Sequence, residues 1–250
     1  MRLPPAPDPS RGVFETLLVA AGEPVEADRH LARLSHSVRE LYGAELAVGG
    51  HDEARLAIAG EAEGLELGRL RLDARPDANG IALSARAVAI DPAIVFPPLE
   101  RGAELRATPI GGWRGDRKWA DRALLDALDA AAAPATALLV DERDGAVLET
   151  TRANLFAVRT DGVLATPPTD GRILPGVARE LTIELARAAG IEVVEATLTR
   201  ADLDAATELF VTGSVRGIEP VRSLDGEAVG GPASPVAATL GAALRERWLG

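Results

Sequence analysis

The sequence contains no cysteine, which excludes disulfides and thiolate chemistry and leads us to expect a cytoplasmic protein. Histidine is almost as scarce, and the three histidines include no Glu-flanked pair at helical spacing, so we expect no zinc or iron site. Aromatic residues make up only 3% of the chain, so the core must be packed mainly with Leu, Val, Ile and Ala. No apolar run approaches the roughly 20 residues of a membrane span, and residues 1–5 lack the apolar core of a signal peptide.

Positive charge is also in short supply. The formal net charge is −11 and the isoelectric point is near 4.9. This balance argues against nucleic-acid binding, which requires a basic face, and against docking on an anionic membrane. A chain of 250 residues with 47% hydrophobic content can form one large domain or two modest ones, each with a core. We therefore expect a globular protein whose partner is a small-molecule substrate.

Two frequent catalytic motifs are missing, and lysine is almost missing too. The chain has neither a Gly-x-x-x-x-Gly-Lys loop nor a Gly-x-Ser-x-Gly elbow. Lys118 is the only lysine among 27 Lys and Arg residues. Arginine cannot replace an amine that must lose its proton and attack a carbonyl carbon, because the guanidinium stays protonated. Lys118 is therefore a candidate Schiff-base nucleophile. The alternative is a solvated loop lysine that has been retained by drift.

The first half of the chain predicts an α+β unit. Leu31, Leu34 and Val38 recur at helical spacing in a segment that Gly43 ends. A second helix is expected at 52–63, and strands are expected at 12–20, 68–74, 81–90 and 104–110. The glycines after Ile110 predict a hinge, which divides the chain into a small domain at 1–108 and a larger one at 109–250 that carries Lys118.

The second half predicts a strand-rich domain. The turn around Asp144-Gly145 is a hairpin signal. A helix is expected to follow Pro175-Gly176 and to stop at Gly190. The remaining elements are expected helices at 120–132, 200–205 and 235–249 and expected strands at 136–142, 146–150, 154–159, 163–166, 192–198, 208–212 and 219–224.

Four features of the sequence could assist an amine nucleophile. Glu149 ends an apolar strand beside a turn, where its carboxylate could point into a cleft, although in isolation a solvated hairpin acid is the simpler interpretation. The amides of Val177 and Ala178 begin a helix and can face an anion. The run from Val211 to Val215 places Thr212 and Ser214 around a glycine, which suits close approach of a phosphate. Arg33 lies at the edge of an apolar stripe, as either a solvated side chain or an anion ligand.

Several motifs in register resemble the class IV, fold-type IV pyridoxal-phosphate enzymes. This family includes branched-chain and D-amino-acid aminotransferases and 4-amino-4-deoxychorismate lyase. The matching pieces follow the family's order along nearly the whole chain: Gly12-Val13-Phe14-Glu15-Thr16, His30-Leu31-x-Arg33-Leu34-x-x-Ser37, Lys118, Glu149 to Phe156, Leu174-Pro175-Gly176-Val177-x-Arg179, and Val211-Thr212-Gly213-Ser214 before Glu219-Pro220-Val221.

The resemblance implies a two-domain α+β fold of the D-amino-acid aminotransferase type, pyridoxal 5′-phosphate as cofactor and a homodimer. Lys118 would form the Schiff base and move protons, and Glu149 would pair with the pyridine nitrogen. Phosphate ligands would be Arg33, the backbone of Val177 and Ala178, and Ser214. Many relatives have threonine where Ala178 stands, so only its amide could contribute.

Two departures bear on the reaction. The aminotransferases carry a tyrosine shortly after the lysine, whereas the only tyrosine here is Tyr42. Lys118-x-x-Asp121-Arg122 is instead similar to the Lys-x-x-Asn-Arg of the aminodeoxychorismate lyases. The Tyr-Gly-Asp lead before Gly-x-Phe-Glu-Thr is also missing, as in lyase-like domains fused to aminobenzoate synthase subunits.

We therefore expect a lyase that converts 4-amino-4-deoxychorismate to 4-aminobenzoate and pyruvate, a step of folate supply. The alternative is an aminotransferase acting on D- or branched-chain amino acids. A cofactor-free Schiff-base aldolase and a non-catalytic binding module are two further hypotheses. The aldolase usually needs a (β/α)8 barrel, which this order of elements does not predict.

Overall fold

The computed structural model describes residues 6–46, 50–230 and 234–250. They form two compact units, one made of residues 6–94 with 117–124 and the other of 95–116 with 125–250. Parts of the expected ranges, residues 1–5, 47–49 and 231–233, lie outside the described residues. No helix among the described segments is long and apolar enough to cross a membrane.

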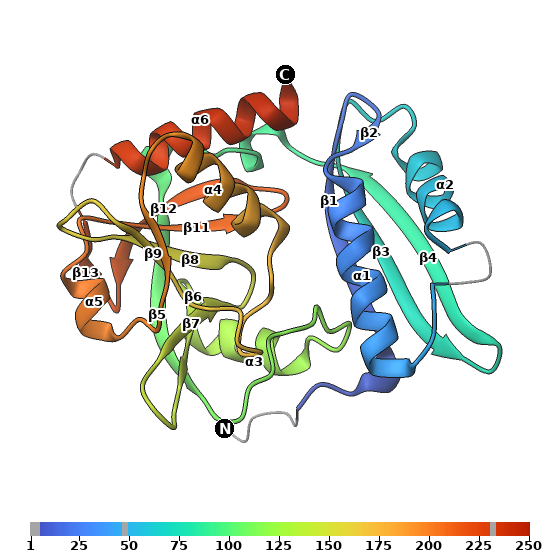
Figure 1. Cartoon of the computed structure of the whole chain (residues 1–250), viewed down its shortest axis with the longest axis horizontal. Coiled ribbons are helices and arrows are strands. Elements are labelled where there is room, and N and C mark those ends of the chain that lie inside the picture. Colours follow the sequence, from blue (N-terminus) through green and yellow to red (C-terminus); the bar gives the residue numbers. More distant parts are fainter. Residues whose placement is uncertain (1–5, 47–49, 231–233) are drawn as a thin grey trace. The chain divides into compact units, whose positions relative to one another are not determined.

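The first unit is a four-stranded antiparallel sheet with two helices against it (Figure 1). The sheet order is β2-β1-β3-β4. The helix α1 ends as expected, because Gly43 takes up a left-handed conformation with φ 61° and its N–H bonds to the carbonyl of Arg39. The elements are a 3-10 turn at Pro9–Arg11, β1 (Val13–Ala20), β2 (Glu23–Pro24), α1 (Ala27–Tyr42), α2 (Gly50–Ala62), β3 (Leu67–Asp77) and β4 (Gly80–Ala89).

The core of the first unit lies between its sheet and its helices. Alternate residues of β1, including Val13 and Leu17, are completely buried. Leu31, Leu34 and Val38 of α1 are buried at the expected helical spacing, and α1 packs against β1 and β3. The periodic pattern thus predicted both the helix and the face that it buries.

The second unit is built on a nine-stranded mixed sheet, counted over the described residues, with α4 and α6 packed against it. A 3-10 turn at Pro92–Ile94 ends the first unit. The elements of the second unit are a 3-10 turn at Leu99–Arg101, β5 (Ala103–Ile110), α3 (Ala123–Ala132), β6 (Thr136–Asp141), β7 (Val147–Thr150), β8 (Asn154–Val158), β9 (Leu164–Thr166), α4 (Val177–Ala188), β10 (Val193–Glu195), α5 (Arg200–Asp204), β11 (Glu208–Gly213), β12 (Gly217–Leu224), β13 (Glu227–Ala228) and α6 (Pro235–Leu249).

Six of these strands close into a barrel. The path runs β8-β11-β12-β5-β6-β7, and β7 returns to pair with β8. The β12–β5 and β5–β6 pairings are parallel, whereas the β11 and β7 pairings are antiparallel. Closure leaves no free edge along these six strands. The two residues that join β7 to β8 are Glu149 and Asn154.

The boundary between the units differs from the expected division after residue 108. The strand β5 belongs to the second unit because it pairs with β6 and β12 of that unit. Residues 117–124, which we call the Lys118 segment, belong to the first unit. The hydropathy pattern predicts β5 as a strand, but it does not indicate which sheet the strand joins.

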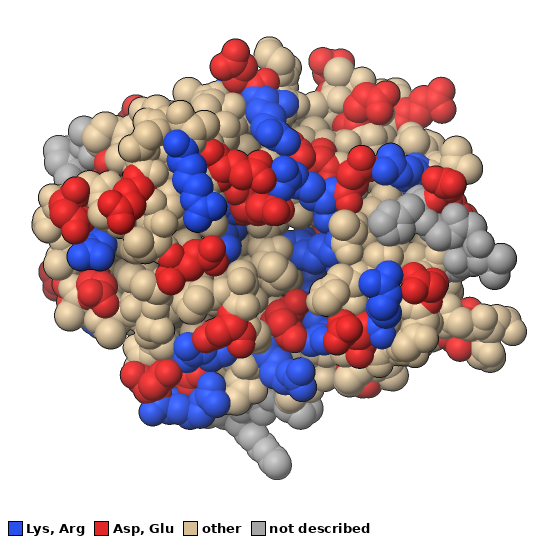
Figure 2. All heavy atoms as spheres, viewed as in Figure 1, with Lys and Arg blue, Asp and Glu red and all other residues tan. Residues whose placement is uncertain are grey.

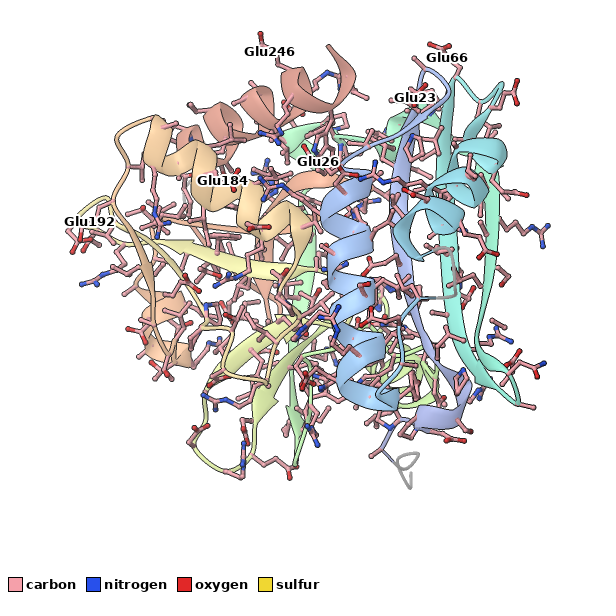
Figure 3. All side chains as sticks on the ribbon, turned by 45° about the vertical axis from the view of Figure 1, so that its right-hand side comes forward. Glu23, Glu26, Glu66, Glu184, Glu192 and Glu246 are labelled. Carbon is pink, nitrogen blue, oxygen red and sulfur yellow. The ribbon has the colours of Figure 1, made fainter. Side chains whose placement is uncertain are left out.

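The excess negative charge lies largely at the surface. Figure 2 shows acidic and basic side chains interspersed over the face in view. Five exposed acids are labelled in Figure 3: Glu23, Glu66, Glu184, Glu192 and Glu246.

Candidate active site

The Lys118 segment is held to the start of β1 by backbone hydrogen bonds. The amide of Phe14 donates to the carbonyl of Lys118 at 2.9 Å, and the amide of Ala120 donates to Gly12 at 3.0 Å. Gly12 is required here, because its φ is 88° and a Cβ would lie 2.3 Å from the carbonyl oxygen of Ala74. The segment is therefore fixed to the sheet, and the Lys118 Nζ lies 5.0 Å from the centre of the Phe14 ring.

A second cation lies over the same ring. The guanidinium carbon of Arg71, on β3, is 3.8 Å from the centre of the Phe14 ring. Arg71 also donates two hydrogen bonds to Asp73, at 2.8 and 2.7 Å. The register places both side chains on the face of the sheet that carries Phe14. This face of the first unit thus brings positive charge next to the only lysine.

Arg33 lies on the opposite side of β1, where it binds an anion supplied by the protein. Its Nε and NH2 groups donate to the two oxygens of Glu15 at 2.8 and 2.5 Å. His30 Nδ1 lies 2.8 Å from the same carboxylate, and both Glu15 and His30 are only 1% exposed. The interpretation of Arg33 as a solvated side chain is therefore wrong, since its side chain is 9% exposed. Its role as a phosphate ligand stays a prediction.

The two buried side chains Glu15 and His30 differ in their protonation. Burial alone would raise the pKa of Glu15, but the charge of Arg33 and the hydrogen bonds from His30 and Arg33 lower that pKa to about 2. Burial lowers the pKa of His30 from its ordinary value, although its hydrogen bond to Glu15 acts in the opposite direction. We therefore assign an ionised Glu15 that accepts a hydrogen bond from the Nδ1–H of a neutral His30.

Glu149 of the second unit is a buried acid with both oxygens engaged. Asn154 Nδ2 donates to one oxygen at 2.9 Å, and the amide of Leu174 donates to the other at 3.0 Å. Asn154 Nδ2 also donates to the carbonyl of Leu174 at 2.9 Å. Glu149 is 7% exposed, so the interpretation as a solvated hairpin acid is wrong. Two N–H donors hold the carboxylate in one orientation.

Asn154 also borders the start of α4. A Cβ on Gly176 would lie 2.0 Å from Asn154 Oδ1, so any larger residue at this position would require Asn154 to move. Gly176 is the N-cap and provides no side-chain cap. The intrahelical ladder begins with Glu180 N bonding to Gly176 O, which leaves the amides of Val177 and Ala178 without intrahelical acceptors. The first turn of α4 can thus present N–H groups to an anion.

Arg179, in the first turn of α4, has a structural role. Its NH2 group donates to the carbonyl of Pro167 at 2.8 Å and to Glu195 at 2.7 Å. It therefore ties α4 to the strand region of β9 and β10.

The hairpin of β11 and β12 contributes Thr212 and Ser214. Thr212 pairs in register with Asn154 of β8, and Gly213 pairs with Gly217, so Ser214 lies in the connecting turn. The turn is packed from outside by Phe96, whose ring occupies the place of a Cβ on Gly217 and whose amide donates to Arg216 at 3.0 Å.

The structure thus distributes the predicted site residues over both units. Glu149, Val177, Ala178 and Ser214 belong to the second unit, and Lys118 and Arg33 belong to the first. Within the described residues, no group of three or more His, Asp or Glu side chains could hold a metal ion.

The sequence patterns assigned no role to Glu15, His30 or Asn154. Glu15 had a recognisable signal, because it alternates with Val13 and Leu17 on the inward face of a strand. The partnership of Glu149 with Asn154 was not visible, because it depends on the register in which β7 meets β8.

Comparison with known proteins agrees with the motifs. The family model for amino-transferase class IV matches residues 12–224. A putative branched-chain-amino-acid aminotransferase of Methanocaldococcus jannaschii is 47% identical over 93 residues, covering 37% of this chain and 32% of that protein. That match therefore spans about a third of the relative's length. A probable branched-chain-amino-acid aminotransferase of Thermotoga maritima is 28% identical over 227 residues, or 85% of this chain and 77% of that protein.

Two solved structures have the same fold. A hypothetical aminotransferase of Mycobacterium tuberculosis, in its PLP-bound form, has a TM-score of 0.82 at 24% identity, covering 99% of this chain and 94% of that chain. A putative 4-amino-4-deoxychorismate lyase of Legionella pneumophila has a TM-score of 0.80 at 24% identity, covering 95% and 91%.

Proposed function

Because the chain belongs to the amino-transferase class IV family, whose cofactor is pyridoxal phosphate, we propose that it is a lyase that converts 4-amino-4-deoxychorismate to 4-aminobenzoate and pyruvate. The observation that carries this choice concerns tyrosine. No tyrosine follows Lys118, and the hydroxyl of the only tyrosine, Tyr42, donates to the carbonyl of Pro9 at 2.6 Å. The chain thus lacks the tyrosine that its resemblance to aminotransferases would place after the lysine.

The residues of the second unit fit the cofactor. Glu149 presents a fixed carboxylate suited to a protonated pyridine nitrogen, and two N–H donors hold it in place. Val177 and Ala178 offer backbone amides, and Ser214 offers a hydroxyl in the turn after Thr212. Thr212 adds a buried hydroxyl with no hydrogen-bond partner among the described residues. When bound, pyridoxal phosphate supplies an electron sink for the charge left on a substrate carbon.

Each of the proposed site residues then has a role. Lys118 would provide the amine that holds the cofactor's aldehyde carbon, and once the substrate amine had replaced it, Lys118 would accept the proton from the substrate carbon. The bond between the substrate ring and the enolpyruvyl oxygen would then break, so that the ring becomes aromatic and the leaving enolpyruvate takes up a proton to give pyruvate. Glu149 would hold the pyridine nitrogen protonated, and Arg33, the amides of Val177 and Ala178, and Ser214 would bind the phosphate. Glu15 orients Arg33 for this purpose.

The observed contacts of Asp121 support the lyase less than its sequence motif does. Its Oδ2 accepts from the amide of Asp8 at 3.1 Å, and its Oδ1 accepts from the amide of Ala123 at 3.2 Å, at the start of α3. These contacts give Asp121 a local structural role in the first unit and in the first turn of α3. The proposal therefore relies on the missing tyrosine rather than on Asp121.

The second candidate is transamination of a D- or branched-chain amino acid. It is favoured by the relatives from Methanocaldococcus jannaschii and Thermotoga maritima, which are described as branched-chain-amino-acid aminotransferases. Both reactions remove a proton from the carbon that bears the amine, so the same parts serve either one. The proposal also includes a homodimer of twice the 26.0 kDa chain and a cytoplasmic location.

The two reactions are separated by their products. Purified protein loaded with pyridoxal phosphate is mixed with 4-amino-4-deoxychorismate, and 4-aminobenzoate is measured by its fluorescence. In parallel, leucine or D-alanine is supplied with 2-oxoglutarate, and formation of glutamate is measured. Formation of 4-aminobenzoate supports the lyase. Rapid glutamate formation without 4-aminobenzoate would reverse the ranking.

A Lys118→Ala variant tests the central residue. We expect it to lose either activity by at least about 10³-fold, since it removes the nucleophile and the base together. Mass spectrometry of the borohydride-reduced holoenzyme should find the pyridoxyl group on residue 118 of the wild type. A reduced wild-type protein without this adduct would refute both candidates.

A further inference from the structure

Thr212 carries a buried hydroxyl without a hydrogen bond to any described residue. Thr212 is 2% exposed, and its Oγ1 has no hydrogen-bond partner in the part of the chain that the structure describes. Buried hydroxyls are almost always paired, so an orphan of this kind requires an explanation.

The other buried threonines of the second unit are all paired. Thr166 donates to the carbonyl of Leu155 at 2.8 Å, and Thr182 donates to that of Ala178 at 2.7 Å. Thr150 donates to the carbonyl of Ala153 at 3.0 Å, and Thr151 donates to Asp129 at 2.6 Å. Thr212 is therefore the exception among five buried threonines in the described part of the chain.

The position of Thr212 indicates what its hydroxyl faces. In an antiparallel pair, residues in register project from the same face of the sheet. Thr212 is in register with Asn154, and Asn154 is in register with Glu149. Asn154 also touches Gly176, the residue that opens α4. The orphan hydroxyl thus shares a sheet face with Glu149 and with Asn154, the residue that borders the first turn of α4.

We propose that the Thr212 hydroxyl is a further contact of this protein to its cofactor, donating a hydrogen bond to an oxygen of bound pyridoxal phosphate. The proposal rests on the cofactor placement given under Proposed function. It explains why the hydroxyl is unpaired in the protein alone: its acceptor arrives with the ligand. In the apoprotein the hydroxyl then contributes nothing to stability, because burial has removed it from water without a replacement.

A Thr212→Val variant should weaken cofactor binding without destabilising the apoprotein. Valine has nearly the same shape and keeps the preference for a strand, so only the hydroxyl is lost. We expect the urea midpoint of the apoprotein to stay the same or rise. The dissociation constant of pyridoxal phosphate, from absorbance titration of the apoprotein, should increase about tenfold, which corresponds to about 1.4 kcal/mol. Thr212→Ser should return the dissociation constant to within about twofold of the wild type.

Thr166→Val is the matched control, because it removes a buried hydroxyl that does have a protein acceptor. We expect it to lower the urea midpoint of the apoprotein and to leave the dissociation constant unchanged. The proposal is overturned if Thr212→Val binds pyridoxal phosphate as the wild type does, or if it destabilises the apoprotein as much as Thr166→Val. The second outcome would mean that the hydroxyl already has an acceptor, such as a buried water.

A Ser214→Ala variant separates this proposal from the cofactor placement. If Ser214→Ala weakens binding and Thr212→Val does not, the placement stands and only the contact to Thr212 is refuted. If neither variant weakens binding, the placement of the phosphate at the β11–β12 turn is refuted with it.

Discussion

Glu15 and Arg33 form a two-pronged ion pair between β1 and α1, with N–O distances of 2.8 and 2.5 Å and side-chain exposures of 2% and 9%. Replacing Glu15 by Gln leaves the guanidinium buried without its counter-charge. We expect unfolding free energy to fall by about 3–5 kcal/mol, as for other buried pairs that lose one partner. Urea denaturation at pH 7 measures this loss.

The control for this substitution is Asp161→Asn. Asp161 pairs with Arg159 at 3.3 Å, and both side chains are more than half exposed. We expect a change below about 0.5 kcal/mol, because solvent screens such a pair. Equal losses in the two variants would contradict the special role of the buried pair.

The same buried group makes stability depend on pH. Glu15 has a folded pKa of about 2 against 4.5 for the free side chain, and His30 also has a folded pKa below its ordinary 6.5. For both groups the folded state binds its proton less tightly than the unfolded state does. Their stabilisation is therefore complete above the unfolded pKa values and is lost as the pH falls.

The measurement is unfolding free energy between pH 8 and pH 2. We expect a decline that begins as the pH falls below about 6.5 and steepens below about 4.5. The difference between wild type and Glu15→Gln should shrink as the pH falls from 5 to 2. If this difference in unfolding free energy grew toward low pH, the pKa of Glu15 would be raised by folding and not lowered.

Gly176→Ala should disturb Glu149 without touching it. A φ of −71° suits alanine, so the effect is purely steric: the new Cβ would lie 2.0 Å from Asn154 Oδ1. Displacing Asn154 removes a donor from Glu149. We expect a loss of about 1–3 kcal/mol in stability, as in other overpacked sites, and weaker retention of pyridoxal phosphate in equilibrium dialysis.

Gly60→Ala is the control for added bulk. It lies inside α2, and a Cβ there meets no atom within 4 Å. Because alanine is the better helix former, we expect stabilisation by about 0.5–1 kcal/mol and unchanged cofactor retention. If Gly176→Ala behaved in the same way, the close contact with Asn154 would be disproved.

Glu208 caps a helix that starts 27 residues later in the sequence. Its two carboxylate oxygens accept the amides of Val236 and Ala237, each at 3.0 Å, at the start of α6. We expect Glu208→Ala to lower unfolding free energy by about 0.5–2 kcal/mol, as loss of other helix caps does. Thermal unfolding measures the effect, and the exposed Glu227→Ala should leave the melting temperature unchanged.

Local features of the fold were readable from the sequence. The spacing of Leu31, Leu34 and Val38 predicted α1, Gly43 predicted its end, and the predicted helix at 235–249 matches α6. These signals depend on residues a few positions apart, which is the range that a periodic pattern reports.

Non-local features were not readable. The parallel pairing of β5 with β12 joins residues more than 100 positions apart, and no pattern in either strand specifies it. The burial of Glu149 depends on the barrel that this pairing helps to close, whereas its contact with Asn154, five residues later, depends on the register of the turn between β7 and β8. The carboxylate bound to Arg33 was missed because two charges facing a core are individually rare and are explained only as a pair.

The barrel closes where β7 turns into β8, and Glu149 and Asn154 are the one residue pair in register between these two strands. On heating, a change in this turn would move the carboxylate of Glu149 away from the amide of Asn154 while the longer strand pairings stay intact. The absorbance of bound pyridoxal phosphate should therefore change before the strands melt, and it would report the earliest step of thermal unfolding.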